Sequence, residues 1–330
     1  MADSVGSRGK VWASLITNTS YLRGLLTLAH SLQRVQTRYP LIALYTDTLP
    51  ADGIAALDAR NIPRHRVPLI RPTCGKTYKA DARFNDTWTK LVAFSLVEYE
   101  RVVLLDSDMV VLRNMDELMD LELDAPDLNG DGALVFAAAH ACACNPLKKP
   151  HYPTEWVPEN CALTTQHAEP DRAQREGAPA SSGVGMLNSG LLVINPSQGI
   201  FDKIQAALNE PALVQKYHFP DQGLLSEIFA GRWYPLPYIY NGLRTLRWEG
   251  VHSKIWRDEE VKVVHYIFDN KPWLDQRPEN RETERSNGLG NGPSTQSSWK
   301  QSDAMIHDWW WDIDEDRRRS EQEKGIVNGL

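Results

Sequence analysis

The 330-residue sequence lacks long apolar runs, and only four of its residues are cysteines. The longest apolar runs, such as residues 133–139, fall far short of the ~20 residues that span a bilayer, so we expect no membrane span. The start, MADSVGSRGK, has no apolar segment of the kind that a secretory signal requires. These absences favour a cytoplasmic protein with reduced cysteines.

Basic residues are in the minority, with 36 Lys and Arg against 43 Asp and Glu, a net charge of −7. Such a chain is a poor candidate for binding nucleic acid, although a local cluster of donors can still hold a small anion. The sequence also has no Gly-x-Gly-x-x-Gly and no Gly-x-x-x-x-Gly-Lys. Their absence weighs against a dinucleotide-binding Rossmann motif and against a P-loop phosphohydrolase.

The order of the periodic segments predicts an α/β fold. Apolar runs typical of strands occupy 11–17, 41–45, 101–105, 133–139, 186–195 and 261–267. Steps of three and four between apolar residues predict helices at 21–39, 51–60, 88–99, 201–208 and 222–229. Strands that alternate with helices indicate a mostly parallel sheet flanked by helices.

Composition divides the chain into three predicted parts. Residues 1–274 form the α/β domain, with an irregular insertion at about 140–185. Residues 275–300 are rich in Gly, Ser, Asn and charge, and are interpreted as a flexible linker. Residues 301–330 predict a C-terminal tail helix that docks through Trp309, Trp310 and Trp311 and leaves a charged face in solvent.

Asp106 and Asp108 directly follow the apolar run 101–105. Ligands of open parallel sheets bind beyond the carboxyl ends of the strands, and residues i and i+2 of an extended segment point to the same side. Two carboxylates placed in this way suit Mg²⁺ or Mn²⁺; a loop with a helix cap is the plainer interpretation. His265, at the end of the last predicted strand, is either structural or a nitrogen ligand that favours Mn²⁺.

Other polar segments flank predicted elements. Lys271 precedes a Pro-Trp turn and is either a phosphate contact or a surface residue. Residues 15–21 place hydroxyls, an amide and the ring of Tyr21 before a helix N-terminus, where free N–H groups bind anions. Residues 187–190 suit close approach of a ligand, or a bulge. Asp221, after a proline, is either an N-cap or a group that holds sugar hydroxyls.

A group of cysteines and histidines in the insertion resembles zinc ligation. Its members are His140, Cys142, Cys144, His151, Cys161 and His167. The spacing does not contain a Cys-x-x-Cys pair, so the signal is weak and free thiols are the default interpretation. The sequence leaves open whether Cys142, Cys144 and Cys161 bind a metal or stay free.

Six segments occur in the order in which one known family has them. They are SLITNTSY (14–21), TWTKLVAFSLVEYERVVLLDSDMVVLRNMDEL (87–118), LNSGLLVINPS (187–197), FPDQGLL (219–225), PYIYN (237–241) and VVHYIFDNKPW (263–273). Through these segments the chain resembles the retaining glycosyltransferases of family 8, which include glycogenin and the plant galactinol synthases. The segment CACNPLKKPHYP is similar to that of fungal or plant-type members rather than glycogenin.

The resemblance implies a GT-A fold, with a Rossmann-like sheet that binds a UDP-sugar together with Mn²⁺, or Mg²⁺ in its place. It implies a metal site made of Asp106, Asp108 and His265. The residues that would contact the nucleotide or phosphates are Leu15, Thr17, Asn18, Tyr21, Lys90, Ser107 and Lys271. Those expected around the donor sugar are Asn188, Ser189, Asp221 and Gln222. Asp221, Gln222 and Lys271 are the candidate catalytic residues.

The resemblance further implies transfer of a hexose from a UDP-sugar to a small-molecule or glycan hydroxyl, as in galactinol synthase. Two alternatives remain: a glycogenin-like self-glucosylating primer, using Tyr238, Tyr240 or Tyr266, and a non-catalytic sugar-nucleotide binding protein. Trp248 stands where glycogenin has its acceptor tyrosine, and Phe268 where it has a glycine. A second copy of the chain, in a homodimer, is a further candidate partner.

Overall fold

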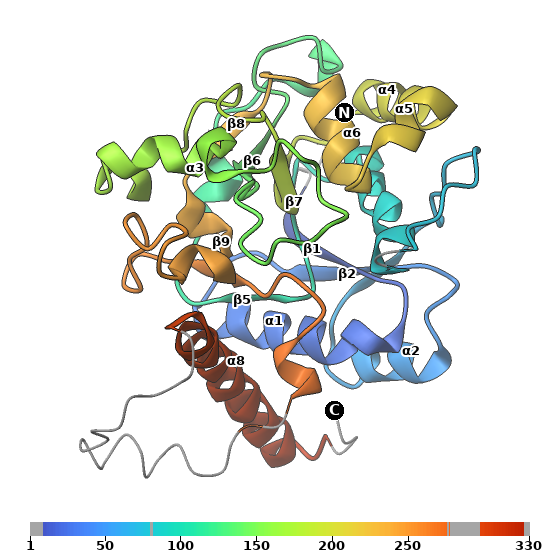
Figure 1. Cartoon of the computed structure of the whole chain (residues 1–330). Helices are drawn as coiled ribbons and strands as arrows, with labels where there is room; N and C mark the ends of the chain where they lie inside the picture. Colours follow the sequence, from blue (N-terminus) through green and yellow to red (C-terminus); the bar gives the residue numbers. More distant parts are fainter. Residues whose placement is uncertain (1–8, 80–81, 276, 278–297, 327–330) are drawn as a thin grey trace, which may run out of the picture.

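A seven-stranded sheet forms the centre of the molecule (Figure 1). The computed structural model describes residues 9–79, 82–275, 277 and 298–326. In spatial order the strands are β3 (Arg64–Arg66), β2 (Leu41–Tyr45), β1 (Lys10–Ile16), β4 (Arg101–Leu105), β7 (Leu187–Ile194), β6 (Phe136–His140) and β8 (Tyr234–Leu236). Strand β7 runs antiparallel to both of its neighbours, and the other pairs are parallel. The mostly parallel sheet is therefore confirmed.

Helices cover both faces of this sheet. They are α1 (Leu22–Arg34), α2 (Ala51–Asp58), α4 (Gln198–Leu208), α5 (Pro211–Lys216), α6 (Pro220–Ile228) and the 3₁₀ helix η3 (Thr87–Ser95); the short helix α3 (Ala162–Thr165) belongs to the insertion. Side chains of β1 alternate between the faces: Val11 and Ala13 join the core under η3 and α4, and Trp12 packs with α1. The α/β class predicted from the alternation is correct.

Two predicted helices differ in detail from the structure. The first, expected over 21–39, ends at Arg34, because Gln36 has a φ of 56° in the left-handed region, which an α-helix cannot accommodate. The helix predicted at 88–99 is the 3₁₀ helix η3, which ends at Ser95. Both differences lie in backbone conformation, which apolar periodicity does not specify.

A second, three-stranded sheet lies beside the first. It consists of β5 (Met109–Val111), β10 (Val263–His265) and β9 (Gly242–Leu243), with β10 in the middle. His265 ends the last strand, as predicted, but that strand belongs to the small sheet rather than to the main one. Because β5 follows β4 after a short turn and Met109 pairs with His265, the small sheet brings His265 next to Asp108.

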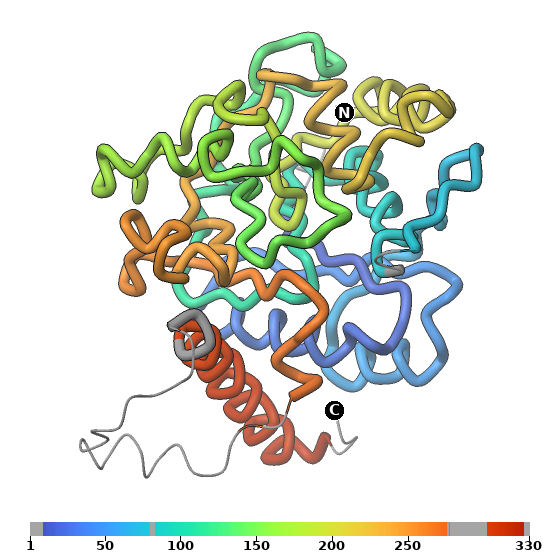
Figure 2. The backbone as a smooth tube through the Cα atoms, viewed as in Figure 1, coloured from blue at the N-terminus to red at the C-terminus, as the bar shows by residue number. Residues whose placement is uncertain are grey.

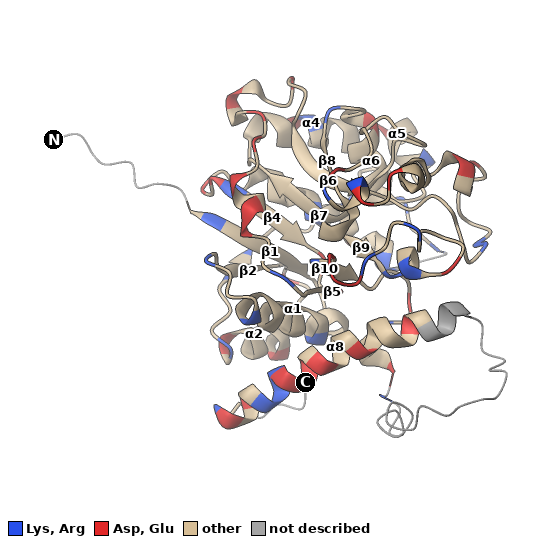
Figure 3. Ribbon diagram, turned by 90° about the vertical axis from the view of Figure 1, so that its left-hand side faces the viewer, with Lys and Arg blue, Asp and Glu red and all other residues tan. Residues whose placement is uncertain are grey.

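The C-terminal helix α8 (Ser298–Glu323) lies along α1, as Figures 1 and 3 show. Trp310 and Trp311 are buried; the ring of Trp310 lies 5.7 Å from that of Trp273, and Trp311 Nε1 donates to the Pro272 carbonyl at 3.0 Å. The predicted tail helix docked by its tryptophans is thus present, and acidic and basic residues follow along it (Figure 3). Of the predicted linker, residues 276 and 278–297 lie outside the described residues, and the three-part division stays a prediction.

No helix in the described part of the chain combines the length and the hydropathy that crossing a bilayer requires.

Candidate active site

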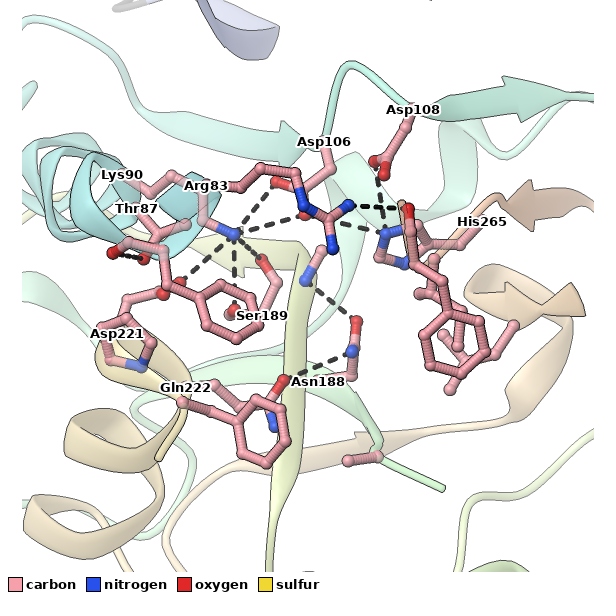
Figure 4. A pocket seen from close by; sticks show the side chains of 18 of the residues that line it. Arg83, Thr87, Lys90, Asp106, Asp108, Asn188, Ser189, Asp221, Gln222 and His265 are labelled. Carbon is pink, nitrogen blue, oxygen red and sulfur yellow. Dashed lines mark hydrogen bonds and ion pairs between the residues drawn. The ribbon is translucent and has the colours of Figure 1, made fainter. Parts of the chain in front are cut away.

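A cavity of about 450 Å³ opens at the carboxyl ends of β1 and β4 (Figure 4). Because β7 is antiparallel, its first residues reach the same edge of the sheet. All of the predicted site residues line this cavity: Leu15, Thr17, Asn18, Tyr21, Lys90, Asp106, Ser107, Asp108, Asn188, Ser189, Asp221, Gln222, His265 and Lys271. Segments far apart in the sequence thus converge on one site.

Asp106, Asp108 and His265 form a cluster that can hold a metal ion, with one ligand atom from each lying within 4.8 Å of the others. His265 Nε2 lies 3.3 Å from Asp108 Oδ1 and 3.7 Å from Asp106 Oδ2. Both Asp108 and His265 are buried. Two carboxylates and an imidazole are the mixed oxygen and nitrogen donor set that suits Mn²⁺ or Mg²⁺.

A chain of hydrogen bonds orients the His265 ring. His265 Nδ1 lies 3.0 Å from Asn241 Oδ1, an acceptor, so Nδ1 carries the proton and Nε2 is free to bind a cation. Asn241 donates to Asn188 Oδ1 at 2.8 Å, and Asn188 donates to Gln222 Oε1 at 3.2 Å. Sequence reasoning gave Asn241 no role; its place at the end of the segment PYIYN was the only signal.

Two buried lysines neutralise the carboxylates. Lys271 donates to Asp108 and, at 2.6 Å, to the Tyr266 carbonyl. Lys90 Nζ lies 3.0 Å from Asp106 Oδ1 and 3.2 Å from Asp221 Oδ2, as Figure 4 shows. Burial alone would lower the pKa of Lys90, but the two carboxylates raise it above its ordinary value. Burial also opposes ionisation of Asp108, yet Lys271 and His265 hold the pKa of this carboxyl well below its usual value.

The charges and the donor set fit a divalent cation. The cavity is lined by four carboxylates (Asp86, Asp106, Asp108 and Asp221) and by four cationic side chains (Arg83, Lys90, Lys149 and Lys271), so these charges balance. A divalent cation held by Asp106 and Asp108 would add the net positive charge that an anionic ligand requires.

Ser107 points away from the metal cluster. Its hydroxyl donates to the Leu15 carbonyl at 2.9 Å and lies 3.1 Å from Ser14 Oγ, so its side chain ties the acidic turn to β1. On the other side of the cavity, Thr17 donates to Asp86 Oδ2 at 3.2 Å. Asn18 caps a single 3₁₀ turn, accepting from Ser20 N at 3.0 Å, and α1 begins only after that turn.

The insertion supplies a wall of the cavity that the sequence did not predict. Lys149, His151, Tyr152 and Trp156 line it, and the Trp156 ring stacks on Phe219 with centroids 4.6 Å apart. The only signal for this wall was the length of the irregular segment, because aromatic residues in loops have no periodicity.

The two residues that depart from the glycogenin pattern, Phe268 and Trp248, have different structural environments. Phe268 keeps a φ of 74°, a left-handed conformation that suits glycine, and its carbonyl accepts from Arg83 Nη1 at 2.6 Å. Trp248 does not line the cavity; it is buried, and its indole N–H donates to Asp303 of α8 at 2.7 Å. An acceptor-side position for Trp248 is therefore not supported.

Sequence comparison finds relatives that align with most of the chain. The family model described as Glycosyl transferase family 8 matches residues 13–277. Galactinol synthase 3 of Arabidopsis thaliana is 26% identical over 274 residues, covering 82% of this chain and 75% of that protein. Galactinol synthase 2 of Solanum lycopersicum is 25% identical over 329 residues, covering 99% and 85%. Uncharacterized protein R707 of Acanthamoeba polyphaga mimivirus is 26% identical over 259 residues, covering 78% and 79%.

Solved structures of glycosyltransferases share the fold. The glycosyltransferase GlyE of Streptococcus pneumoniae TIGR4 aligns with a TM-score of 0.55 and 16% identity over 97% of this chain, which spans 65% of the length of GlyE. The galactosyltransferase LgtC, solved with donor and acceptor sugar analogs, aligns with a TM-score of 0.54 and 16% identity over 88% of this chain and 100% of LgtC. At such identities the likeness shows the fold alone, which is GT-A, as expected. With the family match over residues 13–277, this establishes that the chain belongs to glycosyl transferase family 8.

Proposed function

We propose that this protein is a retaining, Mn²⁺-dependent glycosyltransferase that moves a hexose from a UDP-sugar to a hydroxyl acceptor, in the manner of a galactinol synthase. The observation that carries the proposal is the convergence of Asp106, Asp108 and His265 beside Lys271 in one cavity. Mg²⁺ is the alternative ion. The similarity to galactinol synthases supports a galactinol-synthase-like hydroxyl acceptor over the other acceptors of the family.

The donor would lie across the ends of β1 and β4. Leu15, Thr17, Asn18 and Tyr21 form the side of the cavity on which the uridine would rest. Asp106, Asp108 and His265 would hold Mn²⁺, which when bound supplies a Lewis acid that neutralises negative charge on the leaving diphosphate. Lys271, fixed by the Tyr266 carbonyl at 2.6 Å, would add a preorganised positive charge for the same phosphates.

Asp221 and Gln222 would position the donor sugar. Asp221 is held by Lys90 and Gln222 by Asn188, so both side chains are oriented before a ligand arrives. This restraint by an ammonium group reduces the nucleophilicity of the Asp221 carboxylate, which favours a positioning role. We therefore propose front-side attack by the acceptor hydroxyl, on the face from which UDP departs, and no covalent glycosyl-enzyme intermediate.

The geometry disfavours a glycogenin-like primer that uses the three tyrosines considered. Tyr238 and Tyr266 are buried, with hydroxyls that donate to the Ile255 and Ile306 carbonyls at 2.9 and 2.8 Å. Tyr240 donates to Glu117 at 2.7 Å. None of the three lines the cavity. An acceptor supplied from solution, against the wall of Tyr152, Trp156 and Phe219, fits better, because aromatic rings pack on the apolar face of a sugar or cyclitol.

Release of UDP from a panel of UDP-sugars, with and without Mn²⁺ and with inositol or oligosaccharides as acceptors, tests the proposal. We expect Asp108→Ala to abolish turnover while leaving the circular dichroism spectrum unchanged. Asp131→Ala, which removes an exposed carboxylate paired with Lys203, is the matched control and keeps full activity.

Full activity of Asp108→Ala in chelated buffer would refute the metal role. The anomeric configuration of the product, determined by NMR, tests retention: inversion would overturn the proposed stereochemistry. Addition of hexose to the protein itself, detected by intact mass, would favour the primer function instead.

A further inference from the structure

A second cluster of metal-ligating side chains lies outside the donor site. Cys142, Cys144, Cys161 and His252 each direct one ligand atom to a common point, and these atoms lie within 4.8 Å of one another. All four cysteines of the chain are free thiols, and three of them are gathered here. We propose that these four residues bind a structural Zn²⁺.

Two sulfur–nitrogen distances in the cluster are close to those of a tetrahedral zinc site. His252 Nε2 lies 3.3 Å from Cys144 Sγ and 3.4 Å from Cys161 Sγ. Zinc bonds of about 2.3 Å to sulfur and 2.0–2.1 Å to nitrogen require separations of about 3.6 Å between the sulfur and nitrogen atoms of a tetrahedron. His252 is therefore placed within a few tenths of an ångström of zinc geometry relative to Cys144 and Cys161, and all four ligand atoms lie within 4.8 Å of one another.

The surroundings of the cluster also resemble those of a metal site. His252 Nδ1 lies 2.8 Å from His167 Nε2, so the ring is oriented by a partner on its far side, as metal-bound histidines are. The backbone N–H of Ala143 donates to Cys161 Sγ at 3.4 Å, a contact that stabilises a thiolate. Cys161 and His252 are both fully buried.

A disulfide explains this arrangement less well. Pairing any two of the three thiols would leave the third beside the imidazole of His252 with no covalent partner. A Zn²⁺ ion uses all four side chains, and a set of three sulfurs and one nitrogen is a common composition of structural zinc sites.

The ligand chemistry separates this site from the donor site. Three thiolates select a soft or borderline ion such as Zn²⁺, whereas the two carboxylates and the imidazole at Asp106, Asp108 and His265 suit Mn²⁺. A structural zinc site has all four positions filled by protein, so it would not exchange its ion with the donor site.

The position of the cluster indicates what the ion would do. Cys142 and Cys144 follow β6 at the start of the insertion, Cys161 precedes α3, and His252 belongs to the segment between β9 and β10. Figure 2 shows this green part of the backbone winding with little regular structure next to the orange segment around residue 250. A metal cross-link would hold the two loop regions together, and with them the cavity wall of Lys149, Tyr152 and Trp156.

The metal content of the purified full-length chain tests the proposal. After dialysis against metal-free buffer without chelator we expect about one zinc per chain by inductively coupled plasma mass spectrometry. The same content is expected in the double variant Asp106→Ala/Asp108→Ala, which removes the donor-site carboxylates. Cys144→Ser and Cys161→Ser should lose the zinc, whereas Cys74→Ser, which alters a half-buried cysteine packed on the main core, should keep it.

A thiol titration of the wild-type chain covers the case in which these variants do not fold. Stepwise addition of a mercurial reagent should release zinc in proportion to the modification of three thiols, and Cys74→Ser should leave this ratio unchanged. Zinc below about 0.1 equivalents per chain, with four reactive thiols or with a disulfide in denaturant, would overturn the proposal. Zinc that is lost from Asp106→Ala/Asp108→Ala but kept in Cys161→Ser would overturn it equally.

Discussion

Gly190 sits where the donor site tolerates no side chain. An ideal Cβ at this position would lie 2.4 Å from His265 Cε1 and 2.7 Å from His265 Nδ1. The backbone is held here on the β4 side, because the Gly190 carbonyl accepts from Asp106 N at 2.8 Å and Leu191 pairs with Leu105; on the β6 side a bulge leaves residues 189–191 without partners. In Gly190→Ala the imidazole must therefore move, which pulls Nδ1 away from Asn241.

The size of this displacement sets the expected effect. Carbon atoms in contact prefer about 3.5–4.0 Å, so the His265 ring must shift by about 1 Å, several times the ~0.2 Å that metal coordination tolerates. Loss of the orienting contact to a metal-bound histidine weakens metal binding by about 10–100-fold, or roughly 1.4–2.7 kcal/mol. Gly190→Ala should also lower the free energy of unfolding by about 1–3 kcal/mol through overpacking.

Mn²⁺ titrations followed by electron paramagnetic resonance of the free ion measure the effect directly, and UDP release at increasing Mn²⁺ measures its consequence. We expect weaker Mn²⁺ binding with partial recovery of turnover at high Mn²⁺. Gly9→Ala is the control, because a Cβ there meets nothing within 4 Å. An unchanged Mn²⁺ affinity in folded Gly190→Ala, within about twofold, would refute the assignment of His265 as a ligand.

Two further predictions concern the tail helix. Asp314 is fully buried and lies 2.6 Å from Arg23 of α1 and 2.7 Å from Arg317. Asp314→Asn should therefore lower the free energy of urea unfolding by roughly 3 kcal/mol. Asp316→Asn, at a half-exposed pair with His30, should change this free energy by less than about 1 kcal/mol. An equal effect of the two would contradict the docking role of Asp314. Burial opposes ionisation of Asp314, but Arg23 and Arg317 hold the pKa of this carboxyl below its ordinary value of 3.8. The ionised carboxylate therefore contributes its full stabilisation above pH 3.8, and this contribution is lost as the pH falls through the lowered pKa. The difference in unfolding free energy between wild type and Asp314→Asn should therefore shrink from pH 7 to pH 3, and a constant difference would refute the linkage.

The parts of the fold that the sequence predicted are those that local pattern determines. The strands at 41–45 and 101–105 have the predicted bounds, because continuous apolar runs between polar residues leave few alternatives. Residues that follow such strands, among them Asp106 and Asp108, necessarily lie at the ligand-binding edge of the sheet. Their convergence with Lys90, Ser189 and Lys271 into one cavity was implied by the family resemblance rather than by local pattern.

What the sequence could not predict depends on contacts between distant loops. His252 completes the cysteine cluster from a segment without periodicity, whereas two histidines within the predicted group do not contribute: His140 bonds to the Ala178 carbonyl at 3.0 Å, and His151 lines the cavity. Local pattern gives no signal for the role of Asn241, because this amide orients His265 only when the small sheet places the two side chains together.

The small sheet and the cysteine cluster stabilise the two sides of one cavity in different ways. On the donor side, backbone pairing of His265 with Met109 fixes a candidate metal ligand next to the acidic turn, so that site is built by the sheet itself. On the other side the insertion has little regular structure, so a metal ion bound by the cysteine cluster would restrain loops that backbone pairing does not hold. Cys142 both lines the cavity and belongs to the cysteine cluster, so a zinc ion there would act directly on the cavity wall. If both proposals hold, removal of the zinc should change acceptor binding more than Mn²⁺ or UDP binding. The residues expected to bind the donor are held by β4, β7 and β10, and none of the four residues of the cysteine cluster belongs to these strands.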